Sequence, residues 1–396
     1  MQKRFALKLV AAVALAAATL SPALAQQTVK FANIVELSGA GASSGTQFNN
    51  GFQMAVKEIN AAGGILGKQI EVTTNDTTSQ PGVALALTKK AVDQDVFAIF
   101  GPVFSGSINV SMKESQKAEI PNFTGGEAAM LTTQGNPYIF RTSFTQATAM
   151  PKAANYIKSA KIKNLAIMFV NNDFGKGGLD MMKKALAGSG VTIVSEISTD
   201  SGQIDFSAPV IKAKQSNADA LFIYINEDES ARALRELKKQ GWNKPMIGET
   251  TLTGQKVIDL AGDAANGAVG HVGLTADAPI PALLNYKVKY SRAFGHETDH
   301  NGIKGYTAPY ILKAAVEKVG KLDRKAVAAA LHGIKIDAAK HPGVLMNVGF
   351  DDKGDLDRES FLVEVKNGRQ VVTQVLPPLN ADNVNVKVGQ KAPAKK

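Results

Sequence analysis

Residues 96–107 read VFAIFGPVFSGS, an apolar run that passes directly into a stretch of glycine, proline and serine. The run at 96–100 has the length and composition of a fully buried strand. A helical pattern begins at Gly106. The start of a helix exposes backbone N–H groups that favour an anion. We therefore expect a strand–loop–helix unit whose loop is suited to a negatively charged ligand.

The same alternation of strand and helix extends on both sides of this unit. VKFANIVE (29–36) precedes it as a strand, and the pattern restarts with the strand NLAIMFV (164–170). Nearly unbroken apolar strands that alternate with helices are typical of parallel sheets covered on both faces. We predict an α/β protein with two doubly wound, Rossmann-like lobes.

The helices after residue 276 have no strands of their own, so we expect them to return to the first lobe. The chain then crosses between the lobes three times, near 143, 276 and 346. The predicted first lobe comprises 26–143 and 277–346, the second lobe comprises 144–276 and 347–385, and 386–396 form a disordered basic tail. A hinge of this kind leaves a cleft between the lobes, where ligands bind beyond the carboxyl ends of the strands.

The N-terminal 25 residues have the pattern of a secretory signal peptide. Three positive charges precede an apolar run at 9–20 and the small-residue pattern Ala23-Leu24-Ala25. The run is too short to span a bilayer. We expect export and cleavage after Ala25. The sequence has no cysteine, which excludes disulfides and a thiol nucleophile.

The charge distribution argues against nucleic-acid binding. The formal net charge is +10, but part of the excess lies in the signal peptide and the tail. The remaining lysines and arginines are interspersed with acids, and aromatic residues make up 6% of the chain. Nucleic-acid-binding proteins show a basic stripe or patch instead. We expect a monomer with no nucleic-acid partner and no cofactor.

One motif suggests a different class of protein, a zinc hydrolase. His296-Glu297-x-x-His300 matches the pattern in which two histidines bind zinc and the glutamate activates water. The pattern requires a helix, but Gly295 and Gly302 indicate a loop. We expect a chance match and keep the hydrolase as an alternative.

Two other motifs fail on spacing. LSGAGASSG (37–45) is one residue too long for a dinucleotide-binding loop and lacks the expected acidic residue. DDKGDLD (351–357) has its glycine at the fourth position, where a calcium loop needs it at the sixth. We therefore predict that the protein is not an enzyme.

A second glycine-rich loop follows the next strand of the first lobe, FTGGEAA (123–129). Adjacent strand ends meet at one edge of a parallel sheet, so this loop, Ser105 and Ser107 would converge on one anion. The alternative is that Ser105 only caps its helix.

Five segments, taken in order, resemble the substrate-binding proteins of branched-chain amino acid ABC transporters, which have the type I periplasmic binding fold. They are LSGAGASSG (37–45), FGPVFSGS (100–107), NNDFGKGG (171–178), ALRELKKQG (233–241) and FDDKGDL (350–356). The resemblance implies a periplasmic protein whose two lobes close on a small ligand and which delivers that ligand to a membrane permease.

The resemblance also implies roles for particular residues. Ser105 would bind the ligand carboxylate with help from the backbone at Gly125 and Gly126, Phe174 would cover the ligand, and Ser44 would line the pocket. The complete predicted site is Ser44, Ser105, Ser107, Gly125, Gly126, Glu127, Phe174, Asn226, Glu227, Glu249 and Thr250.

The sequence departs from the family where the ligand's ammonium group would bind. Glu127 lies near the place of a threonine, and Asn226 followed by Glu227 replaces a tyrosine. The position at which the family has an acidic residue in the second lobe falls on Glu249 or on Thr250, depending on a one-residue register. These carboxylates either rebuild an ammonium site, or they are solvated residues at the rim. We favour the first interpretation and an amino acid of the branched-chain type. The second predicts an aromatic or other carboxylic acid without an amine.

Overall fold

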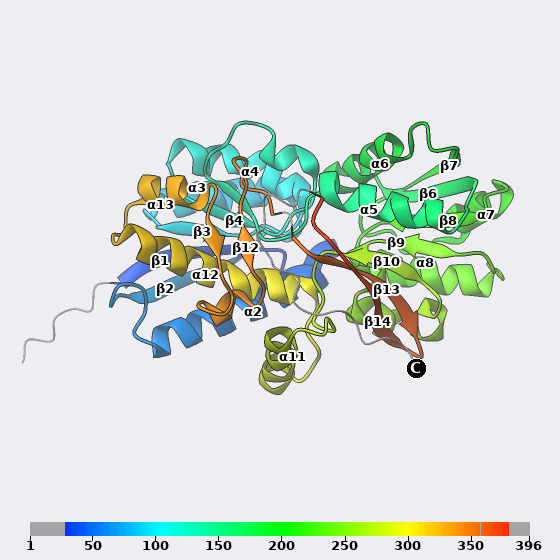
Figure 1. Ribbon diagram of the computed structural model, residues 1–396. Helices are drawn as coiled ribbons and strands as arrows, with labels where there is room; N and C mark the ends of the chain where they lie inside the picture. The colour runs from blue at the N-terminus through cyan, green and yellow to red at the C-terminus, as the bar shows by residue number, and fades with distance from the viewer. Residues whose placement is uncertain (1–27, 357, 380–396) are drawn as a thin grey trace, which may run out of the picture.

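The computed structural model describes residues 28–356 and 358–379. The predicted signal peptide and basic tail lie outside the described residues. Within the described ranges, no helix has both the length and the apolar character needed to cross a membrane. Figure 1 shows two lobes side by side, each built on a sheet with helices around it.

The first lobe contains a five-stranded parallel sheet in the order β2-β1-β3-β4-β5. Its strands are β1 (Thr28–Val35), β2 (Gln69–Asp76), β3 (Ala98–Phe100), β4 (Asn122–Thr124) and β5 (Ile139–Arg141), and the connecting helices are α2 (Ala42–Ala61), α3 (Pro81–Asp93) and α4 (Ser105–Lys117). The strand order reverses between β1 and β3. The loops that follow these strands therefore diverge and leave a crevice at the carboxyl edge of the sheet.

The second lobe repeats this arrangement and adds a hairpin. Its sheet has the order β14-β13-β10-β9-β8-β6-β7, in which β13 is antiparallel to both β10 and β14 and the other pairs are parallel. The strands are β6 (Asn164–Val170), β7 (Thr192–Thr199), β8 (Ala220–Tyr224), β9 (Met246–Gly248), β10 (Val269–Val272), β13 (Ser360–Lys366) and β14 (Arg369–Leu376), and the helices are α5 (Gln146–Ser159), α6 (Asp173–Leu186), α7 (Ser207–Gln215), α8 (Glu227–Lys239), α9 (Thr250–Thr253) and α10 (Gln255–Ala261). The strand order reverses between β6 and β8.

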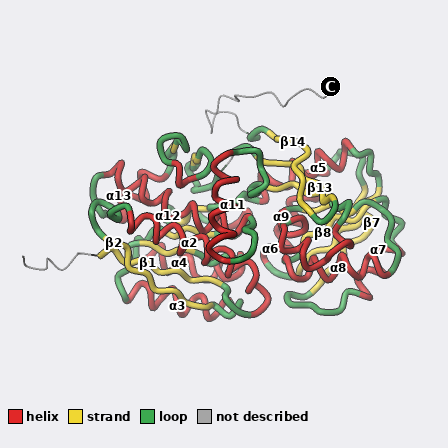
Figure 2. Tube along the Cα trace, turned by 90° about the horizontal axis from the view of Figure 1, so that it is seen from below, coloured by secondary structure: helices red, strands yellow, loops and turns green. Residues whose placement is uncertain are grey.

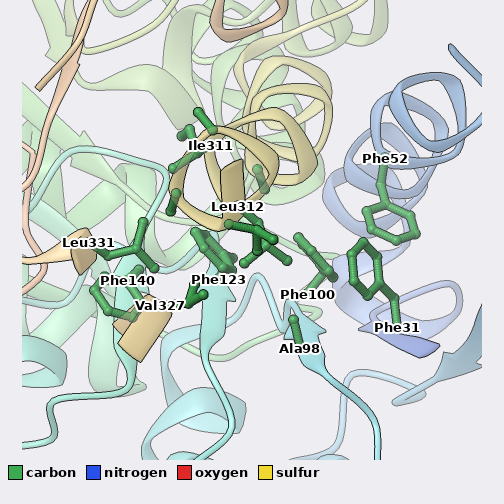
Figure 3. Packing of buried hydrophobic residues seen from close by; sticks show 14 of the residues in the cluster. Phe31, Phe52, Ala98, Phe100, Phe123, Phe140, Ile311, Leu312, Val327 and Leu331 are labelled. Carbon is green, nitrogen blue, oxygen red and sulfur yellow. The ribbon is translucent and has the colours of Figure 1, made fainter. Parts of the chain in front are cut away.

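The late helices α12 (His300–Val319) and α13 (Arg324–Leu331) pack on the first sheet. Figure 3 shows their aliphatic side chains over a row of phenylalanines. Ring centroids lie 5.5 Å apart for Phe100 and Phe123 and 5.6 Å apart for Phe123 and Phe140. Aromatic burial of this kind is a major stabilising contribution to a core. It anchors α12, whose N-terminus lies at the cleft.

The remaining elements are short or lie at the junction of the lobes. Helix α11 (Pro281–Phe294) lies between the lobes in the view of Figure 2. The short strands are β11 (Lys335–Ile336) and β12 (Val348–Gly349), and the 3₁₀ helices are η1 (Gly39–Gly41), η2 (Ala129–Thr132), η3 (Gly262–Ala265) and η4 (Pro342–Val344).

The chain makes its third crossing between the lobes later in the sequence than predicted. β12 pairs with β11 in the first lobe, and Phe350 and Leu356 belong to the first lobe's core. The chain enters the second sheet at Ser360, which is later than the expected position near 346. Two-residue strands carry too little periodicity to be recognised in a sequence. The predicted fold class is nevertheless confirmed.

Candidate functional site

A cavity lies between the lobes, where the crevices of the two sheets face each other. The empty space measures about 390 Å³, including the part open to solvent. Both lobes contribute to its wall, through Ser44, Val103, Phe104, Ser105, Gly125, Glu127, His300, Asn301 and Lys304 from the first and Asn172, Phe174, Asn226, Glu227 and Thr251 from the second. Small-molecule sites commonly lie in clefts between domains, and this cavity has such a position.

The loop before α4 is held by a buried carboxyl group, that of Glu36. It accepts hydrogen bonds from the backbone N–H groups of Val103 at 3.0 Å and Phe104 at 3.1 Å. Burial raises the pKa of Glu36 to about 7, although these two hydrogen bonds lower it. This contact fixes the chain immediately before the first turn of α4.

Helix α4 begins at Ser105, and the N-cap position is occupied by Phe104. The alternative that Ser105 serves as the helix cap is therefore wrong. The Ser105 hydroxyl instead accepts a hydrogen bond from the N–H of Ala128 at 3.2 Å. It thereby connects α4 to the glycine-rich loop after β4. A Cβ at Gly126 would lie too close to Cδ1 of Ile108, so a side chain there would require Ile108 to move.

A buried lysine, Lys304, lies in the first-lobe wall of the cavity. The Lys304 ammonium donates to Glu127 Oε1 at 2.9 Å and to the carbonyl oxygen of Gly125 at 3.3 Å. Its third contact is the side-chain oxygen of Asn301, also at 3.3 Å. Burial raises the pKa of Glu127 to about 7, and Lys304 opposes that rise.

Glu227 bridges the two lobes from the first turn of α8. Its Oε2 accepts from the Ser44 hydroxyl at 2.8 Å, and its Oε1 accepts from the Asn301 amide at 3.0 Å. His300 Nε2 lies 3.5 Å from the same Oε1. Burial raises the pKa of Glu227, and burial lowers that of His300 well below its usual value.

Phe174 reaches the cavity from the first turn of α6. Its ring stacks on that of Tyr224 with centroids 4.2 Å apart. The Gln146 amide donates to the Phe174 carbonyl at 2.7 Å and to the Tyr224 hydroxyl at 3.1 Å. The ring therefore has a fixed support from β8 and α5 and presents an apolar face to the cavity.

Seven of the predicted residues line the cavity: Ser44, Ser105, Gly125, Glu127, Phe174, Asn226 and Glu227. The other four do not reach it. Ser107 and Gly126 are buried and do not line the cavity. Glu249 accepts a hydrogen bond from the N–H of Thr250 at 2.6 Å, and its other oxygen lies 3.1 Å from His271 Nδ1. The residue of that segment that lines the cavity is Thr251.

The sequence interpretation missed the three residues contributed by α12, which are His300, Asn301 and Lys304. Their segment was considered only as part of the zinc motif. Asp299 caps α12 by accepting from the N–H groups of Asn301 and Gly302. The helix therefore begins at His300, and His296 lies outside it.

The zinc hydrolase interpretation is not supported. His296 is exposed, whereas Glu297 forms ion pairs with Lys287 and Arg369. Among the residues that the structure describes, no group of three or more His, Cys, Asp or Glu side chains is placed to hold a metal ion.

Comparisons with known proteins agree with this fold and cleft. The model of the periplasmic binding protein family matches residues 28–370. The Leu/Ile/Val-binding protein BraC3 of Rhizobium johnstonii is 29% identical over 358 residues, which cover 90% of this chain and 96% of the relative. A leucine-, isoleucine-, valine-, threonine- and alanine-binding protein of Pseudomonas aeruginosa is 27% identical over 90% of this chain and 94% of the relative.

Two solved structures have the same fold. The branched-chain amino acid transporter substrate-binding protein LivJ of Streptococcus pneumoniae, in complex with isoleucine, has a TM-score of 0.81 at 24% identity, with 89% of this chain and 100% of that one covered. A solute-binding protein of an ABC transporter from R. palustris, in complex with benzoate, has a TM-score of 0.83 at 20% identity. The match covers 91% of this chain and 100% of that one. The chain belongs to the periplasmic binding protein family.

Proposed function

We propose that this protein is the exported receptor of an ABC importer, which captures a small carboxylate-bearing ligand between its lobes and delivers it to a membrane permease. The N-terminus of α4, beside Ser105 in the cavity wall, carries this proposal. Backbone N–H groups at a helix start bind carboxylates well, and Glu36 holds the preceding loop in place. Since the cavity wall includes both lobes, a bound ligand would stabilise the closed form.

The relatives support a role in transport. Curated relatives are named for the aliphatic amino acids that they bind, and proteins of this fold hold isoleucine in one case and benzoate in another. The fold is therefore compatible with acids that have an amine and with acids that lack one, and the group they share is the carboxylate. Binding and release alone account for this role, so we propose no catalysis.

The proposal includes location and assembly. The pattern at residues 1–25 supports export to the periplasm with cleavage after Ala25. A monomer is sufficient, because both walls of the cavity come from one chain.

A thermal-shift screen tests the proposed function. The panel comprises amino acids, aromatic acids and aliphatic acids, each compared with its uncharged primary amide. A ligand at one hundred times its Kd stabilises the folded protein by about 2.7 kcal/mol. We expect at least one acid to raise the Tm and its amide to have a smaller effect. Stabilisation by neutral compounds alone would contradict the carboxylate site.

A further inference from the structure

We propose that Lys304 supplies the cleft with its own ammonium group, and that the ligand is consequently a carboxylic acid without an amine. This inference rests on the proposed function and narrows its ligand class. It follows from comparing the carboxyl groups near the cavity, each of which already has a donor, with the backbone N–H groups at the start of α4, which have no acceptor.

Lys304 uses the acceptors on its side of the cavity. An ammonium group has three protons to donate, and the Lys304 nitrogen has three oxygen neighbours, on Glu127, Gly125 and Asn301. Its side chain is only 3% exposed. A ligand ammonium placed against Glu127 would displace a buried lysine from its carboxylate, and an unpaired buried charge is strongly unfavourable.

The other carboxyl groups near the cavity also have donors already. Glu227 accepts from Ser44 through one oxygen and from Asn301 through the other. Glu249 accepts from the N–H of Thr250 and faces His271, behind the wall. A ligand ammonium at either group would therefore have to share a carboxylate oxygen with a donor that is already in place.

The open groups are donors. In the part of the chain that the structure describes, the backbone N–H groups of Ser105, Gly106 and Ser107 have no acceptor, as expected for the first turn of a helix. The Thr251 hydroxyl lines the cavity, is buried and has no hydrogen-bond partner within those described residues. The open backbone N–H groups can only donate and the Thr251 hydroxyl can also donate, so both suit a ligand group that accepts, as a carboxylate does.

The local charge agrees with this assignment. Burial raises the pKa of Glu127, Glu227 and Glu249. A raised pKa disfavours the charged form of each carboxyl group and so reduces its repulsion of a ligand carboxylate. Arg141 is paired with Asp355 at 2.6 Å and does not line the cavity. Among the described residues that line the cavity, Lys304 is the one with a cationic side chain.

Matched pairs of ligands test the inference by isothermal titration calorimetry. Leucine is compared with 4-methylpentanoate and phenylglycine with phenylacetate, so that the members of a pair differ in the ammonium group alone. We expect the amine-free member of each pair that binds to bind at least tenfold more tightly. If the amine-bearing member binds equally or more tightly, the inference is wrong and the proposed function stands. If no acid of the pairs or of the wider panel binds, both are wrong.

A substitution tests the role of Lys304 itself. Lys304→Met removes the ammonium and leaves Glu127 and the Gly125 carbonyl available, so the affinity ratio within each pair should shift at least tenfold toward the amine-bearing member. The control is Lys313→Met on the same helix, where the lysine pairs with Glu317 away from the cavity, and it should leave the ratio unchanged. An unchanged ratio in a folded Lys304→Met protein would overturn the assignment. If that variant does not fold, the matched pairs on the unaltered protein decide.

Discussion

The hydroxyl of Ser44 in the first lobe donates a hydrogen bond to Glu227 in the second lobe at 2.8 Å, across 183 residues of sequence. The neighbouring residues repeat the contact, because the Ser43 hydroxyl donates to Asp228 at 2.8 Å. The first turns of α2 and α8 therefore meet directly. These contacts between the lobes favour the closed conformation. A ligand that contacts both lobes would shift the population further from the open to the closed conformation.

The contact between Ser44 and Glu227 can be measured by a double-mutant cycle. Ser44→Ala and Glu227→Gln should each weaken ligand binding, because each removes part of the bridge that holds the lobes together. The two effects should not add, with a coupling energy of about 0.5–3 kcal/mol in titrations of the single and double variants. Additive effects would show that the bridge does not contribute to closure.

Ser105→Ala should reduce ligand affinity by about 1–3 kcal/mol, the range for a charge-assisted hydrogen bond. The matched control is Ser111→Ala on the same helix, where a buried hydroxyl donates to the carbonyl of Ser107 at 2.8 Å. We expect the control to alter the Tm without altering the Kd. Equal affinities for the Ser105 variant and the unaltered protein would refute the site.

The carboxyl group of Glu36 should make stability dependent on pH. Burial raises its pKa from 4.5 to about 7 in the folded protein. Between these values the folded state binds more protons than the unfolded state, so this group lowers the free energy of unfolding as the pH rises through the window. Glu36→Gln should reduce the difference in stability between pH 5 and pH 8 by roughly 1–3 kcal/mol, as measured by urea denaturation.

The matched variant for this measurement is Glu71→Gln, which alters an exposed glutamate on β2. It should retain the slope of stability against pH that the unaltered protein shows. Identical slopes for the Glu36 and Glu71 variants would mean that Glu36 does not titrate in this range.

Purified protein should contain no stoichiometric zinc, and a chelator should not change its Tm. The physical reason is that Glu297 is engaged with Lys287 and Arg369, while His300 faces Glu227 across the cleft. Elemental analysis by mass spectrometry measures the zinc content. One zinc per chain that is lost on His300→Ala would restore the hydrolase alternative.

The sequence was sufficient to predict the lobes and the loops at the ends of their strands. Ser44 and Ser105 follow β1 and β3, and Phe174 and Glu227 follow β6 and β8. All four line the cavity, because a doubly wound sheet places the loops at its switch point beside each other. This part of the site depends on local pattern and on one topological rule.

The contribution of α12 was not predictable in the same way. Lys304 meets Glu127 across 177 residues, and only packing of α12 on the phenylalanine row of the first lobe brings them together (Figure 3). A usable signal was the aspartate before the helix, since Asp299 is an N-cap residue type. This aspartate indicates that a helix starts at His300. The N-terminal end of that helix carries the polar side chains of His300, Asn301 and Lys304, which line the cavity.

The third crossing was misplaced for a related reason. β11 and β12 have two residues each, so no alternation marks them as part of the first lobe. The dipeptide Asn367-Gly368, in contrast, is a clear sequence signal for a hairpin turn. Asn367 and Gly368 both have positive φ in the β13–β14 turn, as an Asn-Gly hairpin requires.

A crystal structure of the protein with its tightest-binding acid tests the central claim most directly. We predict that the ligand carboxylate lies within hydrogen-bonding distance of the N-terminus of α4 at Ser105 and that Phe174 covers the ligand from the second lobe. Lys304 should remain on Glu127 and the Gly125 carbonyl. A ligand bound with its carboxylate away from α4, or bound by one lobe alone, would contradict this account.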